Sequence, residues 1–236
     1  AERPLNRRQW LSIAGLGFLG YYFSAIVNFN GLKYVSVGLE RMILYTYPSL
    51  VVLGSVVFLK KKLSPGIGVA MAVAYLGIAI AFQGEASGGS SSTRTFLGSS
   101  LIFLSALTYA GFVVLSGELL HTLGALRFTA NVLVCSVFFV VLHFVAIHPL
   151  STLADLEPPI WKDGAILALF GTVLPAFLLG IGLKRAGAQR FAIISTIGPV
   201  GTIALAWWVL GERMNNAQII GLVLTLIGGL GVSLKK

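Results

Sequence analysis

One stretch of this chain occurs twice, and the second copy lies 151 residues after the first. Gly31-Leu32-Lys33 recurs as Gly182-Leu183-Lys184, and Pro48 recurs as Pro199. The same ungapped offset also pairs Trp10 with Trp161, Gly20 with Gly171, Leu59 with Leu210 and Gly77 with Gly228. Matches at one offset over about 70 residues indicate an internal duplication, which constrains the fold more than any other feature of the sequence.

The composition places both copies in a membrane. Hydrophobic residues make up 56% of the chain and charged residues only 11%, whereas a soluble domain carries about 25% charged residues. We therefore predict an all-α polytopic membrane protein whose partner is the lipid bilayer. The basic residues lie in short segments between apolar runs, where topology signals are found, so we expect no nucleic-acid partner.

Eight apolar runs are long enough to cross a bilayer as helices. They are Trp10–Asn30, Val37–Leu59, Gly66–Gln83, Phe96–Leu119, Phe128–Ile147, Trp161–Leu183, Gln189–Leu210 and Ala217–Leu234. A Gly/Ser-rich linker at 85–94 separates a first repeat at 1–84, with three helices, from a second at 95–236, with five. Because the offset maps the first two helices of the second repeat to positions before residue 1, we expect a ten-helix parent that lacks two helices here.

An odd number of helices per repeat makes the two repeats enter the membrane in opposite directions. If the segment Arg3–Arg8 is cytoplasmic, alternating loops place most of the 17 Lys and Arg residues inside, as the positive-inside rule requires. The sequence thus predicts two inverted five-helix repeats in the plasma (inner) membrane. Such repeats are typical of secondary transporters.

Motifs in both repeats resemble the EamA-type permeases of the drug/metabolite transporter superfamily. They are Gly182-Leu183-Lys184, a span with a central Pro199, Gly211-Glu212-Arg213, a glycine-rich last helix and, in the first repeat, Tyr45-Thr46-Tyr47-Pro48. Lys60-Lys61-Lys62 stands where the family's first repeat usually has Gly-Glu-Arg. The resemblance implies transport of small metabolites, often outward, by alternating access through a cavity shared by the two halves.

The two prolines mark the predicted site. Pro48 and Pro199 fall in the middle of their spans, where a proline removes one backbone hydrogen bond and kinks the helix, so both are candidate hinges. Polar side chains lie before and after the prolines at helical spacing, and they either line a substrate cavity or bond to neighbouring helices. We expect the cavity to be lined by Tyr21, Asn28, Arg41, Tyr45, Ser49, Ser105, Tyr109, Thr172, Ser195 and Thr202.

Glu40 and Arg41 are adjacent ionisable residues one turn inside the second span. They either form an outer mouth that holds a charged group of the substrate or extend to the membrane interface, and the second interpretation is the commoner one for such residues. Asn28 likewise lies either in the cavity or at the interface.

We therefore predict a transporter, not an enzyme, that moves a small organic metabolite, an amino acid or drug-like compound, outward. No metal constellation, ATPase motif or dinucleotide fingerprint is present, so no cofactor is expected. The alternatives are an organophosphate or nucleotide-sugar exchanger, which needs cations inside the membrane, and a scaffold without transport activity. A homodimer is a further possible assembly.

Overall fold

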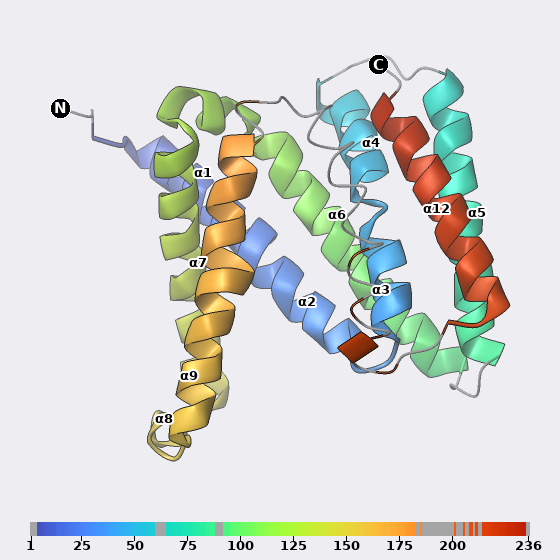
Figure 1. The fold of residues 1–236 in the computed structure, drawn as a ribbon. Helices are drawn as coiled ribbons and strands as arrows, with labels where there is room; N and C mark the ends of the chain where they lie inside the picture. The colour runs from blue at the N-terminus through green and yellow to red at the C-terminus, as the bar shows by residue number, and fades with distance from the viewer. Residues whose placement is uncertain are drawn as a thin grey trace. The chain divides into compact units, whose positions relative to one another are not determined.

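The computed structural model describes residues 4–59, 65–87, 92–182, 185, 201, 205, 208–209, 211 and 214–234. Within these ranges every regular element is a helix, so the predicted all-α class is confirmed. The chain divides into two compact units, Ala1–Tyr22 with Leu115–Gly187 and Phe23–Val114 with Ala188–Lys236. Figure 1 shows the helices in chain order.

The first unit is built on α1 (Arg7–Gly17), which packs against α7 (Ala125–Ile147). Asn6 caps α1 in a capping box with Gln9, which satisfies amide groups that would otherwise lack partners. A Cβ on Gly17 would lie 2.8 Å from the carbonyl oxygen of Val132, so only glycine allows this close approach. Among the described residues, the unit also contains most of η1 (Phe18–Phe23), the end of α6 (Ser92–Leu123), α8 (Ser151–Ala154), α9 (Pro158–Ile166) and η2 (Leu167–Val173).

The described part of the second unit contains six helices or parts of helices around an apolar core. The core joins Leu39, Met42 and Ile43 to Ala81 and Ile102. Its helices are α2 (Ser24–Gly31), α3 (Val37–Leu44), α4 (Tyr47–Leu59), α5 (Pro65–Ser87), α12 (Asn216–Leu234) and the first part of α6 (Ser92–Leu123).

Five of the described helical stretches are long and apolar enough to cross a membrane. They are Arg7–Gly31, Pro65–Gly84, Ser92–Gly117, Ala125–Ile147 and Pro158–Gly182. In the last two, only 11% of the most apolar stretch is buried within the protein, as expected for surfaces that face lipid. The protein is therefore a multi-pass membrane protein.

One of the remaining expected spans differs from the prediction, and another lies outside the described residues. Val37–Leu59 forms two helices, α3 and α4, instead of one continuous helix. Gln189–Leu210 lies almost entirely outside the described residues. The last expected span, Ala217–Leu234, corresponds to α12.

Two segments of π-helix occupy equivalent places in the duplication. η1 covers Phe18–Phe23 and η2 covers Leu167–Val173, and the offset of 151 residues maps η1 onto 169–174, which overlaps η2. Each segment contains one member of the glycine pair Gly20 and Gly171. The π-helix is rare and occurs mostly as single turns within α-helices, so two such turns at equivalent places fit the duplication seen in the sequence.

The helices α5 and α12, which lie side by side in Figure 1, pack with their backbones almost in contact. A Cβ on Gly77 would lie 2.5 Å from the carbonyl oxygen of Gly221, and a Cβ on Gly228 would lie 2.5 Å from that of Ala70. Residue numbers therefore rise along one helix as they fall along the other. We call this antiparallel contact of α5 with α12 the glycine seam.

The glycine seam has the symmetry of the duplication. The offset of 151 residues maps Pro65, the first residue of α5, onto Asn216, the first residue of α12. At the centre, the Thr225 hydroxyl, which donates to the carbonyl oxygen of Gly221 at 2.7 Å, lies 3.4 Å from the carbonyl oxygen of Ala74, and Thr225 and Ala74 are themselves 151 residues apart. Contacts of this reciprocal kind arise when two equivalent elements are related by a two-fold axis.

Candidate functional site

The second expected span is broken at Tyr45 and Thr46, just before the predicted hinge proline. Pro48 is the second residue of α4, a position where the missing proline amide costs no helical hydrogen bond. The Thr46 amide and hydroxyl both donate to the carbonyl oxygen of Ile43, at 3.0 and 2.7 Å. The break is thus stabilised locally, as the interruption of a helix inside a membrane requires.

A polar cluster of Asn28, Glu40 and Arg41 lies at the other end of α3. The Glu40 side chain is 0% exposed, which rules out the expectation that it extends to the interface. Its Oε1 accepts a hydrogen bond of 3.0 Å from Asn28 Nδ2, and its Oε2 lies 3.0 Å from Arg41 Nε. Glu40 also lies in the first turn of α3, where the helix dipole favours a negative charge.

Hydrogen bonding in this cluster is incomplete. Asn28 Oδ1, Glu40 Oε2 and Arg41 Nε are buried and have no hydrogen-bond partner among the described residues. The distance between Oε2 and Nε meets the definition of an ion pair, but the direction of the N–H does not make it a hydrogen bond. A buried polar atom without a partner costs about 1–3 kcal/mol, so the cluster is unsatisfied as it stands.

Tyr45 and Ser49, on either side of the proline, are packed against neighbouring helices. The Tyr45 side chain is 5% exposed and its ring lies against Gly229 of α12. The Ser49 hydroxyl donates to the carbonyl oxygen of Thr46 at 2.7 Å and lies 3.1 Å from the hydroxyl of Tyr75. In this conformation both hydroxyl-bearing residues therefore connect helices.

The two predicted residues of α6 also make contacts within the second unit. The Ser105 hydroxyl donates to the carbonyl oxygen of Ser24 at 2.8 Å and so joins α6 to α2. The Tyr109 ring lies 5.7 Å from that of Tyr47, edge to face, and 5.8 Å from that of Phe112. These contacts fit the interpretation in which polar residues join helices.

The other predicted residues are dispersed or not described. Tyr21 is half-buried in η1, and Thr172 is exposed in η2, both in the first unit. Ser195, Pro199 and Thr202 lie outside the described residues. Of the predicted residues that the structure describes, it brings together only Asn28 and Arg41 in one polar cluster, around the carboxylate of Glu40, for which the sequence left both the outer mouth and the interface open.

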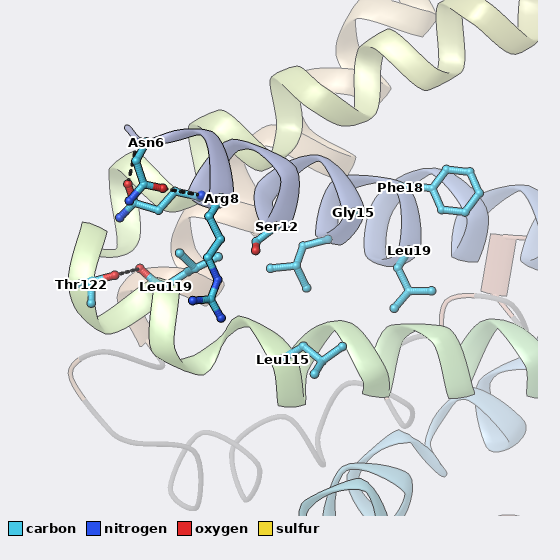
Figure 2. A pocket seen from close by; sticks show the side chains of 11 residues that line it. Asn6, Arg8, Ser12, Gly15, Phe18, Leu19, Leu115, Leu119 and Thr122 are labelled. Carbon is cyan, nitrogen blue, oxygen red and sulfur yellow. Dashed lines mark hydrogen bonds between the residues drawn. The ribbon is translucent and has the colours of Figure 1, made fainter. Parts of the chain in front are cut away.

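The first unit contains a cavity of about 640 Å³ between α1 and the end of α6. Figure 2 shows Arg8 extending from α1 toward α6, while Leu19 and Leu115 provide apolar walls. Asn6 and Gln9 line the cavity but bond to each other, and the Thr122 hydroxyl donates to the carbonyl oxygen of Leu119 at 3.2 Å. The sequence feature that could have indicated this cavity is the group of basic residues near the start of the chain, which we interpret only as a signal of membrane topology.

Comparison with known proteins identifies the family. The EamA-like transporter family matches residues 1–83 and 96–234. The chain belongs to this family. Membership in the EamA-like transporter family confirms the resemblance seen in the sequence motifs and makes transport the general function of the protein.

Several relatives of this EamA-like transporter are themselves named only as transporters. The chain is 32% identical over 220 residues to the uncharacterized transporter YcbK of Bacillus subtilis, a match that covers 88% of this chain and 67% of YcbK. It is 26% identical over 233 residues to the uncharacterized transporter sll1319 of Synechocystis, covering 94% of this chain and 66% of that protein. The chain thus spans about two thirds of the length of these relatives.

A solved structure shares the fold of this family member. A crystal structure, described only as that of a protein, has a TM-score of 0.64, covers 99% of this chain and 79% of its own, and is 19% identical in sequence. At this identity the likeness concerns the fold alone.

Proposed function

We propose that this EamA-like transporter is a secondary transporter that moves a small organic metabolite, an amino acid or drug-like compound, outward across the plasma membrane by alternating access. The observation that carries the proposal is the glycine seam. Its two helices occupy equivalent places in the duplication and run antiparallel. Equivalent helices of opposite direction are what inverted repeats require, and inverted repeats support alternating access.

The proposed topology has eight spans in two repeats, 1–84 and 95–236, joined by the linker 85–94. Two observations support it. The family matches the chain in two segments, 1–83 and 96–234, with the linker between them. The π-segments η1 and η2 fall at equivalent places, which a duplication explains.

The broken span suits a rocking mechanism. A helix interrupted at Tyr45 and Thr46 can change direction without breaking hydrogen bonds in its interior, because those of the break are made locally. Discontinuous helices near the centre of the membrane are a common way for transporters to build substrate sites. We propose that Asn28 and Arg41 contribute to this site, and the other predicted cavity residues stay predictions.

An exchanger of organophosphates or nucleotide sugars is less well supported. Such a substrate needs cationic side chains free to bind phosphate. Arg41 is held beside Glu40, and Lys33, which is exposed, donates to Asn30 Oδ1 at 2.8 Å. These two cations are therefore already engaged.

Efflux from liposomes tests the proposal. The purified full chain is reconstituted in liposomes loaded with a defined mixture of amino acids and drug-like compounds, and the compounds that leave are measured by mass spectrometry. We expect at least one compound to leave faster than from empty liposomes. Liposomes with the Gly228→Leu variant, which forces the glycine seam apart, provide the matched control. Folded protein that releases no compound would favour the scaffold interpretation.

A further inference from the structure

We propose that Glu40 and Asn28 form a binding site for a primary ammonium group of the transported compound, and that the Arg41 side chain occupies this site when no compound is bound. The inference rests on the proposed transport function and deepens it, because it names the chemical group that the transporter recognises. It is carried by the geometry of the polar cluster.

The atoms that lack partners define the ligand. Asn28 Oδ1 and Glu40 Oε2 are both acceptors and both buried without a hydrogen bond in the part of the chain that the structure describes. Two acceptors call for a ligand with at least two donors, and a fully buried carboxylate calls for a positive charge. A primary ammonium has three donors on one compact charged atom and meets both requirements.

Arg41 meets only one of these two requirements, the positive charge. It supplies the positive charge, with Nε 3.0 Å from Glu40 Oε2, but the two atoms are not aligned for a hydrogen bond. It gives nothing to Asn28 Oδ1, which stays without a partner. A guanidinium is planar and its donors point in fixed directions, whereas an ammonium can turn its donors toward both acceptors.

Exposure makes the exchange possible. The Arg41 side chain is 42% exposed while that of Glu40 is 0% exposed, so Arg41 extends from the buried carboxylate to the surface. When Arg41 moves outward, its charge gains hydration and the carboxylate becomes accessible to a ligand.

Among the described residues, the side chains recorded as bonding to the carboxylate are few. The helices α5 and α12 pack against α3 with the apolar side chains of Ile78, Phe82 and Leu222. The charged or polar side chains recorded in contact with Glu40, among the described residues, are those of Arg41 and Asn28. Because an uncompensated charge in such a place is strongly unfavourable, the departure of Arg41 requires that another cation or a proton take its place.

Binding of simple cations tests the site. The purified full chain in detergent is titrated with propylammonium, with tetramethylammonium, which has the same charge but no N–H donor, and with propanoate. We expect propylammonium to bind at least about 10-fold more tightly than tetramethylammonium, since the latter cannot donate to Asn28 or Glu40. Equal binding of the two cations would overturn the proposal.

Substitutions distinguish a ligand-binding role of the polar cluster from a purely structural one. Glu40→Gln should weaken propylammonium binding by roughly 100-fold and Asn28→Leu by roughly 10-fold. Arg41→Ala should strengthen it by about 10-fold, because it removes the internal competitor, and this gain is the readout that a purely structural ion pair would not produce. Lys33→Ala, which removes a nearby cation bonded to Asn30, should leave the affinity unchanged.

The outcomes distinguish this inference from the proposed function. If Glu40→Gln does not fold, the opposite effects of Asn28→Leu and Arg41→Ala still decide the question. Unchanged or weaker binding in Arg41→Ala would overturn the ammonium site. Efflux of a compound without an amine, with no propylammonium binding, would leave the transport proposal standing and remove this one. Propylammonium binding without any efflux would leave the ammonium-binding site standing and remove the transport proposal.

Discussion

The glycine seam makes a quantitative prediction for Gly77→Ala. The added Cβ would lie 2.5 Å from the carbonyl oxygen of Gly221 and 2.7 Å from the amide nitrogen of Thr225. These are backbone atoms, so the clash can be relieved only if α5 and α12 move apart. Overpacking of this kind lowers the free energy of unfolding by about 1–3 kcal/mol. Replacing a helical glycine with alanine raises it by about 1 kcal/mol, because alanine has the higher helix propensity.

The net loss is therefore about 0–2 kcal/mol, which lowers the midpoint of thermal unfolding by up to roughly 8 °C for a chain of this size. The assay is thermal unfolding of the purified protein in one detergent, followed by near-ultraviolet circular dichroism. Gly68→Ala is the matched control, because it lies in the same helix and a Cβ there meets nothing within 4 Å. The control should be stabilised by up to about 1 kcal/mol.

The symmetry of the seam sharpens the test. Gly228→Ala, the equivalent substitution in α12, should destabilise the protein by a similar amount, because its Cβ would lie 2.5 Å from the carbonyl oxygen of Ala70. The double variant should lose less than the sum, since the first substitution has already separated the helices. If Gly77→Ala is as stable as Gly68→Ala, the seam is not close-packed and the reasoning fails.

Three further predictions concern contacts between helices. Ser105→Ala removes a hydrogen bond of 2.8 Å to a carbonyl oxygen of α2 and should cost about 0.5–1.5 kcal/mol, measured by the same unfolding assay. Gly17→Ala places a Cβ 2.8 Å from a carbonyl oxygen of α7 and should destabilise the first unit, whereas Gly15→Ala, with open space, should not. Tyr22→Phe removes the hydroxyl that lies 2.6 Å from His143 Nδ1 and should cost about 0.5–1.5 kcal/mol; an unchanged midpoint would show that this hydrogen bond is not formed.

The positions of long apolar helices could be read from the sequence because hydropathy reports burial in lipid directly. Gly66–Gln83 was expected and Pro65–Gly84 is observed; Phe128–Ile147 was expected and Ala125–Ile147 is observed. The ends differ by a few residues, since helix ends depend on local capping, which an average over the span does not register.

Three features could not be read in this way. The break at Tyr45 and Thr46 depends on side-chain and amide hydrogen bonds to Ile43, which a run of apolar residues does not reveal. The π-segments arise from one extra residue in the hydrogen-bond ladder, which leaves the composition unchanged. The burial of Glu40 depends on Asn28, which reaches it across the connection between α2 and α3. Adjacent charges near the end of a span suggested the interface, and only the tertiary contact places the carboxylate inside.

The paired π-segments carry information about the history of the chain. The offset between the copies is constant from Trp10 and Trp161, before η1 and η2, to Gly77 and Gly228, after them. An insertion that entered only one copy would have changed the offset at that point. The constant offset is what is expected if the extra residue was already present in the half that was copied, in which case the π-helical turn is older than the two-repeat arrangement that contains it twice.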